Sequence, residues 1–75
     1  MTTVDVVYRY GVAPGPNEAR ALDRVREVYG IRRLSFDEQN HTLRVEYDAT
    51  RLSEATVASL LRKAGLDLGE TLQLV

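Results

Sequence analysis

Hydrophobic and polar residues alternate along residues 4–10, 43–47 and 66–74, which is the pattern of half-buried β-strands. A further strand, the second along the chain, is predicted over residues 31–36 from Ile31, Leu34 and Phe36. The segment between the second and third strands, residues 37–41, is polar and predicts a hairpin turn. The fourth strand carries four leucines at alternate positions and is the longest of the predicted strands.

Two further stretches have the 3.6-residue period of an amphipathic helix. The first is residues 18–29, for which we expect Asn17 as the N-cap and Gly30 as the left-handed residue that ends the helix. Its core stripe is expected to be Ala21, Leu22, Val25, Val28 and Tyr29. The second helix follows Ser53 as its cap and ends at Gly65. Its core stripe is expected to be Val57, Leu60, Leu61 and Ala64.

The order of these elements predicts a single α+β domain that spans residues 1–75. Right-handed crossovers arrange a βαββαβ chain as a ferredoxin-like sandwich, with an antiparallel sheet of strand order 4-1-3-2 and both helices on one face. In this topology the loop at 11–17, the hairpin turn at 37–41 and the turn before the fourth strand lie at one end. A functional site is therefore expected at that end.

Alternation also assigns a face of the sheet to each side chain. Tyr8 and Tyr47 share their faces with valine and leucine and are expected in the core. This argues against an RNA-recognition sheet, in which exposed aromatic side chains of the first and third strands stack on bases. The open face is expected to carry Asp5, Val7, Arg9, Arg44, Glu46 and Asp48.

Composition narrows the classes of function. Ten basic and eleven acidic residues give a net charge of -1, which offers no electrostatic reason to bind nucleic acid or an anionic membrane. The chain has no cysteine, so disulfides and thiolate metal sites are excluded. The N-terminal residues lack the pattern of a signal peptide, and no apolar run reaches the ~18 residues of a membrane span. We expect a cytoplasmic protein.

The loop and the first helix resemble those of the heavy-metal-associated domain family, which includes copper chaperones. That family has Gly-Met-x-Cys-x-x-Cys, then a helix, then Gly-Val. At the same spacing this chain has Gly11-Val12-Ala13-Pro14-Gly15-Pro16-Asn17, then a helix, then Gly30-Ile31. The resemblance continues through Leu34-x-Phe36-Asp37, Leu43-x-Val45-Glu46-Tyr47-Asp48 and Ala64-Gly65-Leu66. It implies the same fold over residues 4–70.

The chain departs from the family at the metal ligands. Pro14 and Asn17 occupy the positions of the two cysteines, and Val12 replaces the methionine. Soft thiolates select Cu(I) and Zn(II) at such sites, so neither a metal nor another cofactor is expected here. His41 is the only histidine, and with Asn17 and Glu38 it would fall short of the ligands that zinc requires. A solvated turn histidine is the favoured interpretation.

The resemblance implies a protein-interaction or regulatory module that docks a partner through residues 11–17, with His41 and Leu66 as contributors at the same end. Two alternatives stay open: a sensor of a small molecule or anion, and a residual heavy-metal binding or transport protein with non-thiolate ligands. Free NH groups at a helix N-terminus can bind an anion, but Pro16 removes one donor, and Gly11 and Gly15 do not match a phosphate-loop spacing. A stiff loop that enters a capped helix is the favoured interpretation. No nucleophile–base pair is suggested, and the acylphosphatase loop has no counterpart, so an enzyme is not expected.

The fourth strand also suggests association. It is an edge strand in the 4-1-3-2 order and is longer than the first strand, its expected neighbour. Its last residues, near Leu72, Leu74 and Val75, are therefore expected to extend past the core. A weak homodimer through two-fold antiparallel pairing of this strand would cover the backbone groups and the leucines. The alternative is a monomer in which these residues close the bottom of the core.

Overall fold

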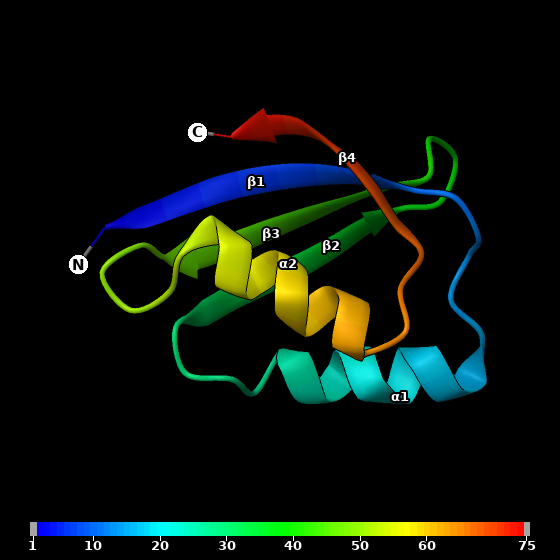
Figure 1. The fold of residues 1–75 in the computed structure, drawn as a ribbon, viewed down its shortest axis with the longest axis horizontal. Coiled ribbons are helices and arrows are strands. Elements are labelled where there is room, and N and C mark those ends of the chain that lie inside the picture. The colour runs from blue at the N-terminus through cyan, green and yellow to red at the C-terminus, as the bar shows by residue number, and fades with distance from the viewer. Residues whose placement is uncertain (1, 75) are drawn as a thin grey trace.

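The computed structural model describes residues 2–74, with Gln73 and Leu74 described by their backbone alone. The elements along the chain are β1 (Thr3–Tyr10), α1 (Pro16–Val25), β2 (Ile31–Asp37), β3 (Thr42–Asp48), α2 (Glu54–Lys63) and β4 (Leu68–Leu74). Figure 1 shows these strands as a single sheet with the two helices packed beside each other. The strand order is β2-β3-β1-β4 with all pairs antiparallel, which confirms the predicted 4-1-3-2 order. Among the described residues, neither helix is long and apolar enough to cross a membrane.

One hydrophobic core lies between the helices and the facing side of the sheet. Tyr8 and Tyr47 are buried in it, as predicted. The open side of the sheet carries ion pairs between neighbouring strands, such as Arg44–Asp5 at 3.5 Å and Arg9–Glu70 at 3.6 Å. Exposed pairs of this kind contribute little stability, so burial of apolar side chains holds the fold together.

The predicted start of the first helix is wrong. The N-cap is Gly15, and Asn17 lies inside the first turn of α1. Two features of the sequence explain the earlier start. Pro16 is well suited to the first helical position, where its missing NH would have no partner in any case. Glu18 then reaches back, and its carboxylate accepts a hydrogen bond from the NH of Gly15 at 2.9 Å.

The predicted end of this helix is also wrong, because α1 ends at Val25. The next NH groups, those of Glu27 and Val28, donate to carbonyls three residues back, so the last turn tightens into 3₁₀ geometry. Tyr29, which we expected in the core, is 72% exposed and lies under the guanidinium of Arg51 at 4.7 Å. Gly30 has the predicted left-handed backbone, with φ at 102°, but it leads into β2 and does not cap the helix.

The second helix begins as predicted, since the Ser53 side chain accepts a hydrogen bond from the NH of Thr56 at 3.2 Å. Its buried residues are Val57, Ala58 and Leu61. The predicted stripe is therefore rotated: Leu60 and Ala64 are half-buried and lie toward α1 rather than over the centre of the sheet. The reason is that α2 packs against two neighbours, the sheet and α1, and its two apolar faces are covered to different degrees.

The fourth strand is less regular than predicted. It begins at Leu68, because residues 66–68 form a tight turn in which the NH of Leu68 donates a hydrogen bond to the carbonyl of Leu66 at 2.8 Å. The register against β1 shifts at two places, where β4 has one residue more than its partner, as in β-bulges. Leu72 is the extra residue at one of them and is 41% exposed. The second bulge includes Gly69, where an added Cβ would lie 2.9 Å from the carbonyl oxygen of Arg9.

These bulges bear on the expected homodimer. Bulges bend an edge strand and interrupt the regular spacing of its outward backbone groups, which disfavours pairing with another chain. The side chain of Leu74 and all of Val75, which the dimer was expected to bury, lie outside the described residues. The dimer stays a prediction.

The open face differs from the prediction at one residue. Asp48 is buried, although it was expected beside Glu46 on the charged surface. Its carboxylate accepts hydrogen bonds from the hydroxyl and the NH of Thr50, at 2.6 and 3.0 Å, and so closes an Asx turn after β3. The same two bonds from Thr50 hold the pKa of the Asp48 carboxyl below its usual range.

Candidate functional site

Three chain segments meet at one end of the molecule, as the topology predicted (Figure 1). The NH of Tyr10, at the end of β1, donates to the carbonyl of His41 in the β2–β3 hairpin at 2.9 Å. The NH of Gly11 donates to the carbonyl of Asp67, between α2 and β4, at 3.1 Å. These backbone bonds fix the start of the β1–α1 loop, residues 11–15, against both neighbouring turns.

Two amide groups of this loop are already bonded to carboxylates of the same chain. Glu18 accepts from the NH of Gly15, as described above, and Asp67 accepts from the NH of Val12 at 3.2 Å. An anion at these two NH groups would have to displace the carboxylates and would meet their negative charges. The geometry therefore disfavours an anion at the NH groups of Val12 and Gly15.

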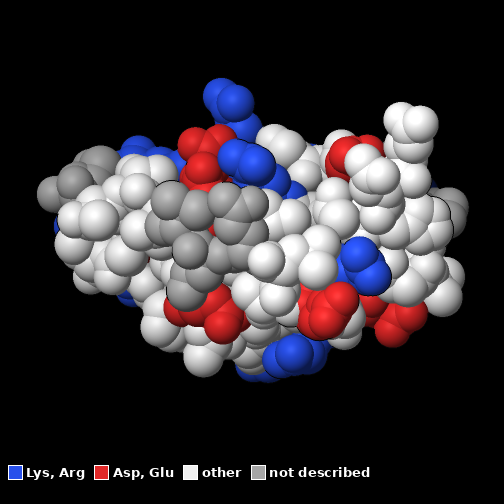
Figure 2. Space-filling model, turned by 90° about the horizontal axis from the view of Figure 1, so that it is seen from above, with Lys and Arg blue, Asp and Glu red and all other residues white. Residues whose placement is uncertain are grey.

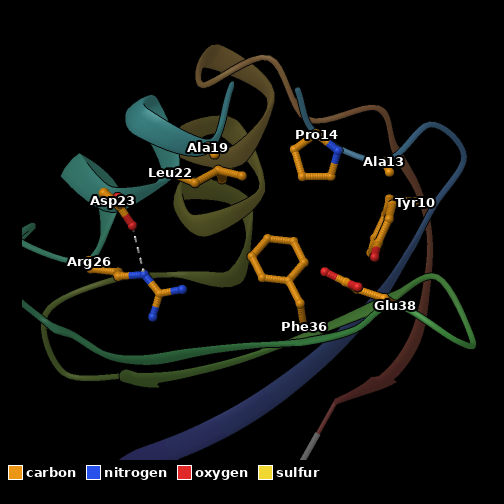
Figure 3. Close-up of a pocket in the computed structure, with 9 residues that line it drawn as sticks. All are labelled: Tyr10, Ala13, Pro14, Ala19, Leu22, Asp23, Arg26, Phe36 and Glu38. Carbon is orange, nitrogen blue, oxygen red and sulfur yellow. Dashed lines mark ion pairs between the residues drawn. The ribbon is translucent and has the colours of Figure 1, made fainter. Parts of the chain in front are cut away.

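A pocket of about 280 Å³ opens between the loop, α1 and β2 (Figure 3). Its apolar wall combines aromatic, aliphatic and small side chains, and its rim carries three charged groups. The residues that line it are Tyr10, Ala13, Pro14, Ala19, Leu22, Asp23, Arg26, Phe36 and Glu38. Ala13 and Pro14 come from the predicted binding loop, so the loop does border a cavity.

Aromatic contacts shape one side of the pocket. The Tyr10 and Phe36 rings meet edge to face, with their centroids 5.8 Å apart and an interplanar angle of 74°. On the other side of Tyr10 the His41 ring stacks nearly parallel, at 5.3 Å and 7°. The Nδ1 of His41 lies 3.3 Å from the carbonyl oxygen of Gly11. His41 thus supports the Tyr10 ring and the loop, and it does not line the pocket.

Two of the three charged groups on the rim compensate each other. The Nε of Arg26 lies 3.4 Å from the carboxylate of Asp23, and its Nη1 donates to the carbonyl of Leu34 at 3.1 Å. The third group, the Glu38 carboxylate, has no ion pair among the described residues. Burial raises the pKa of the Tyr10 hydroxyl, and the charges of Glu38 and Asp37 raise it further.

The other residues predicted for the site lie around the pocket rather than in it. Val12 is 69% exposed, and Asn17 is also exposed, where its side-chain oxygen accepts a hydrogen bond from Arg20 at 3.5 Å. Leu66 is buried in the core, so it supports this end of the domain from within.

Sequence reasoning missed most of the pocket wall, which comes from α1 and from the ends of β1 and β2. Tyr10 and Phe36 were interpreted only as alternating strand residues. Their place beside the loop, each near the end of its strand, was the feature that could have indicated a shared cavity.

No metal site is formed by the described residues, among which no three His, Cys, Asp or Glu side chains gather closely enough to hold an ion. We expect no Cu(I) or Zn(II) binding above weak, nonspecific levels, because thiolates are absent and there is a single imidazole. Competition against a chromogenic chelator measures this, and a His41→Ala variant should behave like the parent chain. A stoichiometric complex of submicromolar affinity would contradict the expectation.

The face above β4, at the opposite edge of the sheet from β2, carries no visible patch of one charge. Figure 2 shows that basic and acidic side chains are interspersed there. Comparisons of the chain with protein-family models, with curated proteins and with solved structures find no match.

Proposed function

We propose that this chain is a ferredoxin-like domain of the heavy-metal-associated type that binds a partner protein, without a metal, through the end that carries residues 11–17. The observation that carries the proposal is the apolar pocket beside this loop. Its volume of about 280 Å³ lies at the lower end of small-molecule sites, which span roughly 300–1,000 Å³. A pocket of this size suits one anchoring side chain of a partner better than a cofactor.

The lining residues support binding rather than catalysis. None of the nine is a cysteine, serine, threonine, lysine or histidine, so the pocket has no hydroxyl–imidazole or thiol–imidazole pair for covalent catalysis. The Arg26 guanidinium contacts Asp23 and the carbonyl of Leu34, and these two contacts hold it in place as part of the pocket wall. The apolar floor and the polar rim together resemble the centre of a protein interface, where an aromatic or aliphatic anchor fills a dry pocket.

Placement of the loop supports the heavy-metal-associated type. In that family the loop after the first strand is the part that meets a partner. In this chain the same loop is fixed by the carboxylates of Glu18 and Asp67 instead of by a bound metal. The domain can therefore present a preformed surface at this end, which lowers the entropic cost of docking.

The proposal is tested by titrating the ¹⁵N-labelled domain with acetyl-phenylalaninamide, a probe for a single anchoring side chain. We expect saturable shifts of the backbone amides of Ala13, Ala19 and Phe36 in the millimolar range. The variant Ala19→Phe should fill the pocket, because Ala19 lies on its wall. The dissociation constant of the probe should then rise at least about tenfold.

The matched control is Ala55→Phe, which adds the same ring at an exposed alanine in the first turn of α2. It should bind the probe as the parent chain does. Shifts spread over the whole surface, or equal loss of binding in both variants, would contradict an anchor pocket at this end of the domain.

A further inference from the structure

The pocket carries one carboxylate, that of Glu38, with no ion pair to any described cation, and we propose that it selects a partner segment in which an aromatic side chain is followed by a lysine or arginine. This inference rests on the proposed function and adds the chemistry of the partner to it. It is carried by the position of Glu38 relative to the aromatic wall and by the charges of the other two rim groups.

The balance of charge on the rim is negative. Asp23 and Arg26 lie 3.4 Å apart, and Arg26 is further held by its bond to the Leu34 carbonyl. The guanidinium thus already interacts with a carboxylate and a carbonyl, so its attraction for an anionic ligand is reduced. Glu38 adds a second carboxylate on the opposite side of the opening.

Figure 3 shows where this carboxylate lies. The Glu38 side chain extends beside the Phe36 ring and toward the hydroxyl end of Tyr10. A ligand whose ring fills the space against Phe36, Leu22 and Pro14 would place its neighbouring group near Glu38. The raised pKa of Tyr10, to which Glu38 and Asp37 contribute, agrees with a negative potential on this side of the pocket.

A cation at that position pairs with the Glu38 carboxylate. An acidic group at the same position would be repelled by Glu38. Because the Tyr10 ring is fixed between Phe36 and His41, the wall does not have to reorganise when the ligand binds.

The experiment compares two blocked dipeptides, acetyl-phenylalanyl-lysinamide and acetyl-phenylalanyl-glutamic acid amide, by the same amide titration of the full chain. We expect the lysine dipeptide to bind about three- to tenfold more tightly at low salt. The ratio of the two dissociation constants should become smaller when the salt concentration is raised to about 0.5 M. In the variant Glu38→Gln the ratio should approach one.

The matched control for charge is Glu27→Gln, which removes one negative charge from an exposed carboxylate just past the end of α1 and outside the pocket lining. It should keep the preference for lysine. Equal binding of the two dipeptides by the parent chain, or an unchanged ratio in Glu38→Gln, would overturn the inference while leaving the pocket as an anchor site. Absence of saturable binding by both dipeptides and by acetyl-phenylalaninamide would instead refute the proposed function itself.

Discussion

Replacing Leu61 by alanine is expected to lower the free energy of unfolding by about 2–5 kcal/mol. The side chain of Leu61 is fully buried in the core, in the last turn of α2, and its removal leaves a cavity that the surrounding strands cannot close. A domain of this size has a total stability of about 5 kcal/mol, so a large fraction of the variant should be unfolded. Urea denaturation followed by circular dichroism measures the loss.

The adjacent residue provides a matched control. Leu60 is half-buried toward α1, and Leu60→Ala removes the same atoms from a less enclosed position. Its loss of stability should be about 1 kcal/mol. Equal shifts of the two urea midpoints would mean that α2 is rotated from the orientation described here.

Raising the pH above 10 is expected to unfold the domain over a narrow range. Tyr8, Tyr10 and Tyr47 are buried, and burial raises the pKa of each hydroxyl above the ordinary value of 10.0. The folded state then retains phenol protons that the unfolded state releases, so unfolding becomes more favourable as the pH rises. Each such tyrosine lowers the free energy of unfolding by up to about 1.4 kcal/mol per pH unit while the pH lies between its unfolded and its folded pKa.

The variant Tyr8→Phe separates this effect from other alkaline damage. Tyr8 donates a hydrogen bond of 2.6 Å to Glu54, so the variant should be about 1 kcal/mol less stable at neutral pH. Above pH 10 its stability should fall less steeply, because one buried phenol fewer releases its proton on unfolding. Stability measured by urea titration at a series of pH values tests both statements, and parallel curves for the two proteins would contradict the explanation.

The sheet was predictable because its signal is local. Alternation at a period of two places Val6, Tyr8, Val45 and Tyr47 on one face whatever the rest of the chain does, and those side chains are buried. The strand order followed from handed connections between consecutive elements. Irregularities of β4 were not predictable in this way, because a bulge depends on how one strand fits its neighbour.

The helices were harder, for a different physical reason. Neighbouring positions on a helix are 100° apart, so an apolar face that contains both Leu60 and Leu61 does not indicate which of them points at the sheet. That choice is made by the second neighbour, α1. The start of α1 could have been found from Pro16 and Glu18, which together form a proline-and-capping-box signature. Asn17 is a good cap by residue type, but Gly15 has the better-placed partners.

The pocket shows the limit of reasoning from a single sequence. Its loop could be singled out from spacing, yet Asp23, Arg26 and Glu38 come from parts of the chain that meet only after folding. Nothing in the local pattern distinguishes Glu38 from its neighbours in a polar turn. The ion pair that leaves Glu38 as the uncompensated charge is a property of the assembled end of the domain.

The two bulges of β4 affect how copies of this domain behave when they are crowded together. Growth of an intermolecular sheet requires evenly spaced NH and CO groups along a free edge, and each bulge breaks that spacing. Gly69 is what allows β4 to approach the Arg9 carbonyl so closely at one of these breaks. A larger residue there would push β4 away from β1 and change the shape of the edge. The shape of the edge that another copy could pair with therefore depends on a glycine outside the pocket lining.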